Sequence, residues 1–193
     1  MPLTGPLTAL SSWLPARRLG KQYARGIDAL IADLGDRDPR TRERAANTLF
    51  RLADRLTPPE RRAAATALGT AARKDDTSLV RSYATAALLA LGCDDAIPIA
   101  LAALQDRDWD VRTFVAFELG RAHEPRIVEA LIPLLQDPQG WVREAAAYSL
   151  GKLQDPRDLP PLRQLAQHER KDLKAKKAAK AAVKALENAH RPH

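Results

Sequence analysis

Few side chains in this sequence have the type and spacing that catalysis or metal binding requires. Four histidines and one cysteine are the candidate bases, nucleophiles and soft metal ligands, namely His123, His168, His190, His193 and Cys93. No two histidines have the spacing of an H-x-x-x-H or H-E-x-x-H motif, which would place two imidazoles on one helix face. A single cysteine forms neither an intrachain disulfide nor a thiolate metal cluster. We therefore expect no catalytic residue, no metal site and no cofactor.

Charge is concentrated at the two ends of the 193-residue chain. The sequence has 31 Lys and Arg against 24 Asp and Glu, a formal net charge of +7. Residues 1–27 hold four basic and no acidic residues, and residues 163–193 hold nine basic and three acidic ones, so the body over 28–162 is mildly acidic. A nucleic-acid groove normally carries cations along the body. Nucleic-acid binding is therefore disfavoured and stays a third hypothesis, through the basic ends.

The C-terminal stretch predicts a strong helix with lysines on one side and alanines on the other. The expected basic patch consists of Lys174, Lys177, Lys180 and Lys184. The simpler interpretation is a solubilising cap, because terminal repeats need a polar outer face. The alternative is contact with phosphate, anionic lipid or an acidic partner. No run of eighteen apolar residues predicts a transmembrane helix, membrane insertion is disfavoured, and the lone cysteine fits a cytoplasmic protein.

An arginine recurs at a fixed spacing, which indicates an internal repeat. Arg81, Arg112 and Arg143 are 31 residues apart, and Arg42 precedes the first of them by 39. An acid stands six residues before each arginine, namely Asp36, Asp75, Asp106 and Asp137. A leucine stands seven residues after each, namely Leu49, Leu88, Leu119 and Leu150. We expect these arginines and acids to form a structural ladder between repeats, with anion binding as the alternative.

Each repeat reads as two helices, such as 97–105 with 110–119 and 127–136 with 141–150. Gly92, Gly120 and Gly151 follow the second helices, where a left-handed C-terminal residue is expected. Pro133 falls inside a first helix and should kink it. No segment alternates with period two long enough to predict a strand, so the fold class is all-α.

The repeat pattern is D-x-x-V-R, as in DWDVR over 108–112, followed by an Ala-rich helix ending in L-G and by D-P-R opening the next helix. The stretch LQDPQGWVREAAAYSLGKLQDPRDLPPL matches it best, with four residues between its first aspartate and V-R. This pattern resembles the short HEAT-like repeats of the phycobilisome-lyase type. The resemblance implies an α-solenoid of about five two-helix repeats in a right-handed superhelix. We expect an N-terminal arm or cap over 1–27, the solenoid over 28–162, and a degenerate last repeat with a capping helix and short tail over 163–193.

The second helix of each repeat carries aromatic residues on the side away from its predicted core stripe. With the repeat arginine as position 0, positions −2, +2 and +5 lie opposite the apolar residues at −1, +3 and +7. The residues expected to bind a partner there are Tyr83, Phe114, Phe117, Trp141 and Tyr148, together with Arg44. A contiguous aromatic band on the inner face predicts an interaction site.

The first hypothesis is a non-catalytic scaffold or adaptor that holds a protein or peptide on this band. The band is alternatively covered by the N-terminal segment, which carries Leu7, Leu10, Trp13 and Leu14, or by a second copy in a symmetric homodimer. The second hypothesis follows from the family resemblance alone: a chromophore-lyase-like accessory factor whose band cradles a tetrapyrrole.

Overall fold

The computed structural model describes residues 26–122 and 124–190, and every regular element in them is a helix. The all-α class predicted from the sequence is confirmed. The predicted N-terminal arm lies almost wholly outside the described residues, as do Trp13, His123 and His193. In the part of the chain that is described, no helix is long and apolar enough to cross a membrane.

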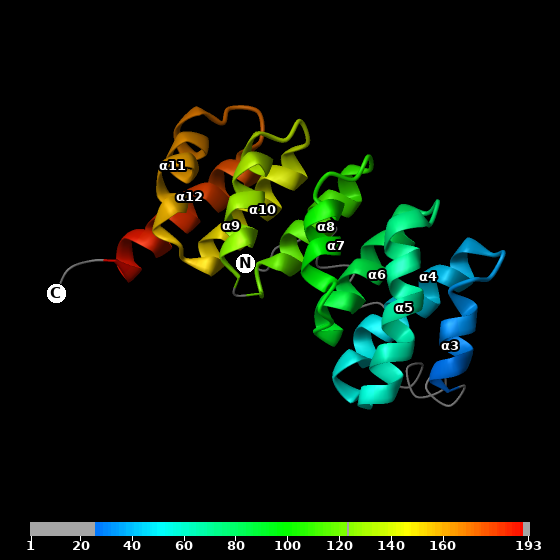
Figure 1. Ribbon diagram of the computed structural model, residues 1–193. Coiled ribbons are helices and arrows are strands. Elements are labelled where there is room, and N and C mark those ends of the chain that lie inside the picture. Colours follow the sequence, from blue (N-terminus) through cyan, green and yellow to red (C-terminus); the bar gives the residue numbers. More distant parts are fainter. Residues whose placement is uncertain (1–25, 123, 191–193) are drawn as a thin grey trace. The chain divides into compact units, whose positions relative to one another are not determined.

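The chain divides into two compact units at Cys93 and Asp94. The first unit contains two helix pairs, in which α3 precedes α4 and α5 precedes α6 (Figure 1). Its elements are α3 (Ile27–Asp33), α4 (Pro39–Leu52), the 3-10 helix η1 (Ala53–Arg55), α5 (Pro58–Lys74) and α6 (Ser78–Leu91). The second helices of the two pairs, α4 and α6, pack against each other.

The second unit contains three helix pairs, and the second helix of each pair packs against that of the next. Its elements are α7 (Ala96–Ala103), α8 (Trp109–Leu119), α9 (Pro125–Leu131), the 3-10 helix η2 (Ile132–Gln136), α10 (Gly140–Leu153), the 3-10 helix η3 (Pro156–Asp158), α11 (Leu159–His168) and α12 (Leu173–Ala189). With the first unit, the described residues therefore contain five helix pairs, the number predicted from the repeat.

Local sequence explains where these helices begin and break. The Asp38 carboxylate caps α4 by accepting the Arg40 N–H, and Thr57 with Glu60 forms a capping box at the start of α5. Pro133 ends the regular α9 and leaves a 3-10 turn, as its missing N–H and its position inside a helix predicted.

The core follows the two apolar columns of the repeat. The leucines at position +7 are all buried, with 0 to 1% of their surface exposed, and the valines Val80, Val111 and Val142 at −1 are fully buried. Because these residues lie on the same side of successive second helices, they form the continuous apolar layer between helix pairs within each unit.

The three glycines that follow the repeat leucines do not share one role. Gly92 has φ 66° and ends α6 in the left-handed conformation, as predicted. Gly120 has φ −63°, and Gly151 lies inside α10, so the same prediction is wrong for both. A Cβ on Gly120 would lie 2.6 Å from Ser149 Oγ, and one on Gly151 would lie 2.7 Å from Ala182 Cβ. These two glycines allow close approach of neighbouring second helices.

Candidate partner-binding face

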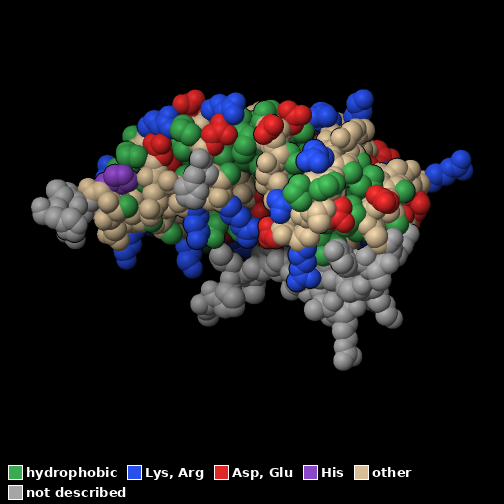
Figure 2. Space-filling view, turned by 60° about the horizontal axis from the view of Figure 1, so that its bottom comes forward, with side chains coloured by type: hydrophobic (Ala, Val, Ile, Leu, Met, Phe, Trp, Pro, Cys, Tyr) green, Lys and Arg blue, Asp and Glu red, His purple; other side chains and the backbone are tan. Residues whose placement is uncertain are grey.

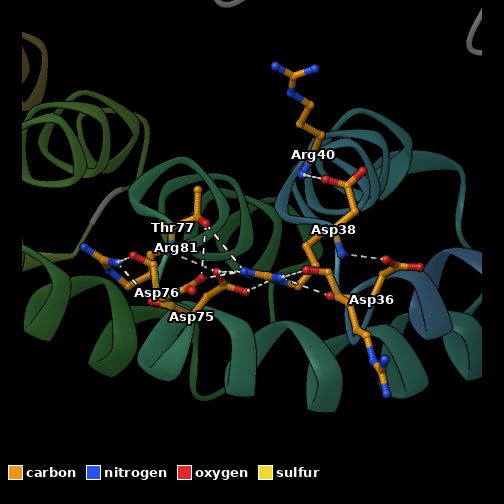
Figure 3. Close-up of polar contacts among 9 residues, drawn as sticks. Asp36, Asp38, Arg40, Asp75, Asp76, Thr77 and Arg81 are labelled. Atoms are coloured by element: carbon orange, nitrogen blue, oxygen red, sulfur yellow. Dashed lines mark hydrogen bonds and ion pairs between the residues drawn. The ribbon is translucent and has the colours of Figure 1, made fainter.

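Arg42 connects two successive repeats of the first unit. Its Nε donates to Asp75 Oδ2 at 2.7 Å and its Nη2 to Asp75 Oδ1 at 3.1 Å, a bidentate pair between α4 and the turn before α6. Figure 3 shows the carboxylate of Asp75 in this turn, beside Asp76 and Thr77. Arg42 Nη1 donates to the carbonyl of Asp36 at 3.0 Å. Only 13% of the Arg42 side chain and 6% of the Asp75 side chain are exposed. The guanidinium therefore fixes its own turn and the following one together.

Arg112 makes the equivalent connection in the second unit. Its Nε and Nη2 donate to the two carboxylate oxygens of Asp137 at 2.8 and 3.0 Å, and its Nη1 donates to the carbonyl of Asp106 at 2.8 Å. Asp137 Oδ1 also accepts the backbone N–H of Gln139. Each such aspartate thus holds its own turn and binds the arginine of the preceding repeat.

The next connection uses a residue that the repeat spacing missed. Arg143 Nε lies 2.8 Å from Glu169 Oε2, an ion pair without the alignment of a hydrogen bond. The other oxygen of Glu169 accepts the N–H groups of Lys171 and Asp172. Backbone donation, reinforced by Arg143, lowers the pKa of Glu169. Counting 31 residues from Asp137 reaches His168, so the last turn is one residue out of step, and the longer Glu side chain makes the contact.

All four repeat arginines also contact the backbone of their own turn in the same way. Arg42, Arg81, Arg112 and Arg143 each donate through Nη1 to the carbonyls six and five residues earlier. A cation that satisfies these carbonyls and a neighbouring carboxylate is engaged within the fold. These contacts favour a structural role for the arginines over anion binding.

Two of the five predicted partner-binding aromatics are buried. Tyr83 is 4% exposed and Phe114 8% exposed. Both occupy position +2, which lies closer to the apolar stripe of the helix than −2 or +5, and Ala145 at the same position is also buried. Desolvation raises the pKa of Tyr83 to about 12, and Glu43 of α4 adds to the shift. The exposure expected for these two rings is therefore wrong.

The other three aromatics are half-buried and lie on α8 and α10. The rings of Phe117 and Tyr148 stack with their centroids 5.0 Å apart and an interplanar angle of 14°. The Lys152 ammonium lies 5.6 Å from the centroid of Tyr148, and the Lys174 ammonium lies 4.1 Å from the centroid of Trp141. Each half-buried ring of α10 thus has a lysine at cation–π distance.

Three carboxylates of this part of the second unit differ in their partners. Asp172 caps α12 by accepting the N–H groups of Lys174 and Ala175. Glu118 pairs with Arg121 at 3.1 Å, and burial raises the pKa of the Glu118 carboxyl. Burial also raises the pKa of Glu144, whose Oε2 is buried without a hydrogen-bond donor.

We call the surface formed by Phe117, Trp141, Tyr148, Lys152 and Lys174 the aromatic–lysine face.

The remaining candidates are exposed basic side chains with other surroundings. Arg44 is exposed on α4 and donates to the Arg40 carbonyl and the Thr41 hydroxyl of its own helix. Lys177, Lys180 and Lys184 are exposed on α12, opposite the buried Ala175, Ala179, Ala182 and Leu186. Lys174 differs from them because it lies over the Trp141 ring. The space-filling view shows basic side chains standing out among acidic and hydrophobic ones (Figure 2).

The two described histidines each contact a backbone carbonyl of their own helix. His168 Nδ1 lies 3.0 Å from the Gln164 carbonyl, and His190 Nδ1 lies 3.0 Å from the Leu186 carbonyl, each within its own helix turn. Cys93 is half-buried after α6. Among the described residues, no group of three or more His, Cys, Asp or Glu side chains is arranged to hold a metal ion.

Paired helices stacked through repeated Arg–carboxylate contacts define an α-helical repeat protein. More particularly, residues 97–187 match the family model for HEAT repeats, so the HEAT-like resemblance drawn from the sequence is confirmed. No curated protein sequence matches the chain significantly.

Solved structures show the same fold. The complex of CpcE and CpcF of phycocyanin lyase from Nostoc sp. PCC7120 matches with a TM-score of 0.67 and 25% sequence identity. The match covers 84% of this chain and 65% of the chain in that complex, so this protein spans just under two thirds of that chain's length. A designed armadillo repeat protein in complex with peptide (KR)4 matches with a TM-score of 0.62 and 18% sequence identity, and the match covers 93% of this chain and 90% of that one. Human deoxyhypusine hydroxylase matches with a TM-score of 0.55 and 20% sequence identity, and the match covers 88% of this chain and 77% of that enzyme. Helical repeats of this kind thus occur in enzymes as well as in binding proteins.

Proposed function

We propose that the chain is a non-catalytic scaffold that holds a protein or peptide partner on the aromatic–lysine face. The observation that carries this proposal is the stacked, half-buried pair Phe117 and Tyr148 on adjacent helices. Aromatic side chains dominate the energetics of protein interfaces, with hot spots of about 2 kcal/mol or more each. Stacked helix pairs also present extended surfaces that such proteins use for binding.

Rigidity of the supporting helices favours binding at this position. Ser149 of α10 donates to the Phe117 carbonyl of α8 at 3.5 Å, and the close contact at Gly120 brings the same two helices together. The two rings are therefore held by the packed core below them. A preorganised aromatic surface loses little conformational entropy when a partner covers it.

Partner capture tests the proposal. The double substitution Phe117→Ala with Tyr148→Ala should reduce recovery of specific partners on the immobilised chain about tenfold, while Trp109→Ala should not. Trp109 is a suitable control because it is 40% exposed but does not belong to the aromatic–lysine face. Recovery is measured by quantitative mass spectrometry, and thermal unfolding is followed by circular dichroism. Unchanged recovery by a folded double variant would refute the proposal.

A second candidate function follows from the 25% identity with the lyase complex. In this alternative, the chain is a chromophore-lyase-like accessory factor and the rings of the aromatic–lysine face contact a planar tetrapyrrole. Titration with biliverdin should then shift the visible absorption band of the pigment, and the Phe117→Ala, Tyr148→Ala variant should lose the shift. An unchanged spectrum at saturating protein would exclude this alternative.

A further inference from the structure

The last two second helices present matching rows of side chains to the same surface. Lys174 of α12 lies over Trp141 of α10, and a Cβ on Gly151 would contact Ala182, so the two helices run side by side in the same direction. Trp141, Tyr148 and Lys152 of α10, with the buried Ala145 between the two rings, therefore face the same way as the row that begins at Lys174 and continues through residues three to four apart. That second row is Lys174, Ala178, Ala181 and Ala185.

These two rows differ in side-chain size. On α10, Trp141 and Tyr148 are large and half-buried. On α12, Ala181 is exposed and Ala178 and Ala185 are half-buried. A low apolar strip thus lies beside an aromatic ridge, and an apolar helix face can rest on that strip while its side chains contact Tyr148.

The charges at the ends of the rows are of one sign. The Lys174 ammonium lies over Trp141 at one end and the Lys152 ammonium lies over Tyr148 at the other, and these two rings are separated by seven residues, or about 10 Å along the axis of α10. Neither lysine forms an ion pair with a carboxylate of the described residues, although Glu144 lies close enough to interact electrostatically with Lys174. The nearby Asp172 is occupied by the N-terminus of α12. An anionic partner is therefore complementary to both ends.

We infer that the partner segment is an acidic amphipathic helix, an inference that rests on the proposed function. Its apolar side packs on the strip between Tyr148 and Ala181, and two of its carboxylates, about seven residues apart, contact Lys152 and Lys174. A nucleic acid fits less well, because the lysines are separated by an apolar surface instead of following one another at phosphate spacing.

Three labelled peptides test this inference by fluorescence anisotropy on the full chain. All three form the same Leu-faced amphipathic helix: the first has glutamates seven residues apart, the second has lysines at those positions, and the third has its glutamates fourteen residues apart. The first peptide should bind about tenfold more tightly than either other one, because only its two glutamates pair with both lysines at once. Its affinity should fall with added salt.

Matched charge reversals locate the contact. Lys152→Glu with Lys174→Glu should remove the preference for the first peptide, and Lys180→Glu with Lys184→Glu, which changes the net charge equally on another side of α12, should retain it. Equal or tighter binding of the lysine peptide, tighter binding of a labelled 20-base single-stranded DNA, or loss of preference in both variants would overturn the inference. If no peptide binds but capture still depends on Phe117 and Tyr148, the acidic helix is excluded while the proposed scaffold function stands.

Discussion

The Arg112 guanidinium donates to both carboxylate oxygens of Asp137, 25 residues later in the chain, with only 13% and 6% of the two side chains exposed. A planar, bidentate pair of this kind is among the stronger polar contacts in proteins. Because Asp137 also accepts the Gln139 N–H, one carboxylate organises both a turn and a repeat junction.

We therefore expect Asp137→Ala to destabilise the protein by on the order of 3 kcal/mol, since it leaves a largely buried guanidinium without its anion. Arg157→Ala is the control: it removes exposed pairs with Glu129 and Asp155 and should cost under about 1 kcal/mol. Urea unfolding monitored by circular dichroism measures both. Equal midpoints for the two variants would show that the junction does not depend on the buried pair.

Asp158 is expected to make stability fall as pH rises. Its side chain is fully buried and neither oxygen has a hydrogen-bond donor. Asp158 is the N-cap of α11, but the residues that normally donate to an N-cap side chain are Pro160 and Pro161, which have no N–H. Burial, with a contribution from Asp155, raises the pKa of Asp158 to about 7.

The folded-state pKa of Asp158 lies above its ordinary value of 3.8, so the folded protein binds this proton more tightly than the unfolded chain. The carboxyl is neutral in both states below about pH 3.8, and stability is lost between that pH and about 7. Asp158→Asn should therefore be stabilised relative to the parent at pH 8 by on the order of 2 kcal/mol or more, and by much less at pH 4. Thermal unfolding at both pH values measures this, and a gain independent of pH would contradict it.

Much of the fold follows from the sequence because the repeat columns have one physical role each. Leucine at +7 and valine at −1 are buried in every repeat that has them, and the arginine at position 0 always reaches its own turn. The exposure predicted for the aromatic residues at position +2 is wrong for a physical reason. A helical wheel separates the apolar side of a helix from the polar side, but it does not show how far neighbouring helices cover the boundary between the two. Tyr83 and Phe114 lie at that boundary.

The last repeat was harder to predict because its register changes. Lys174 matches the repeat arginine by count, but it contacts Trp141, and Glu169 supplies the carboxylate for Arg143. A two-residue search around each expected acid would have found Glu169. The different roles of Gly92 and Gly151 depend on which residue packs opposite, and this information is not local to the L-G motif.

Gly151 tests the close contact between α10 and α12. Gly151→Ala should lower the free energy of unfolding by about 1 to 3 kcal/mol, because the added Cβ would lie 2.7 Å from Ala182 Cβ and 3.0 Å from its Cα. Gly35→Ala is the matched control, since its Cβ would meet the Ala32 carbonyl oxygen at an ordinary 3.5 Å. Urea midpoints compare the two. A Gly151→Ala protein as stable as the control would mean that the two helices separate without cost.

Glu169 should give the opposite pH dependence to Asp158. Donation from the Asp172 and Lys171 N–H groups, together with Arg143, lowers the pKa of Glu169 from its ordinary 4.5, so the folded state favours the carboxylate. This stabilisation is fully present above about pH 4.5 and is lost as the pH falls through the lowered folded-state pKa. Glu169→Gln should therefore be less stable than the parent at pH 7, and the difference should shrink on acidification below pH 4.

Glu187→Gln, which removes an exposed pair with Arg163, provides the control and should show little difference at either pH. If Glu169→Gln retained the parent's stability at pH 7, the contact with Arg143 would not be what holds α12 against the preceding repeat.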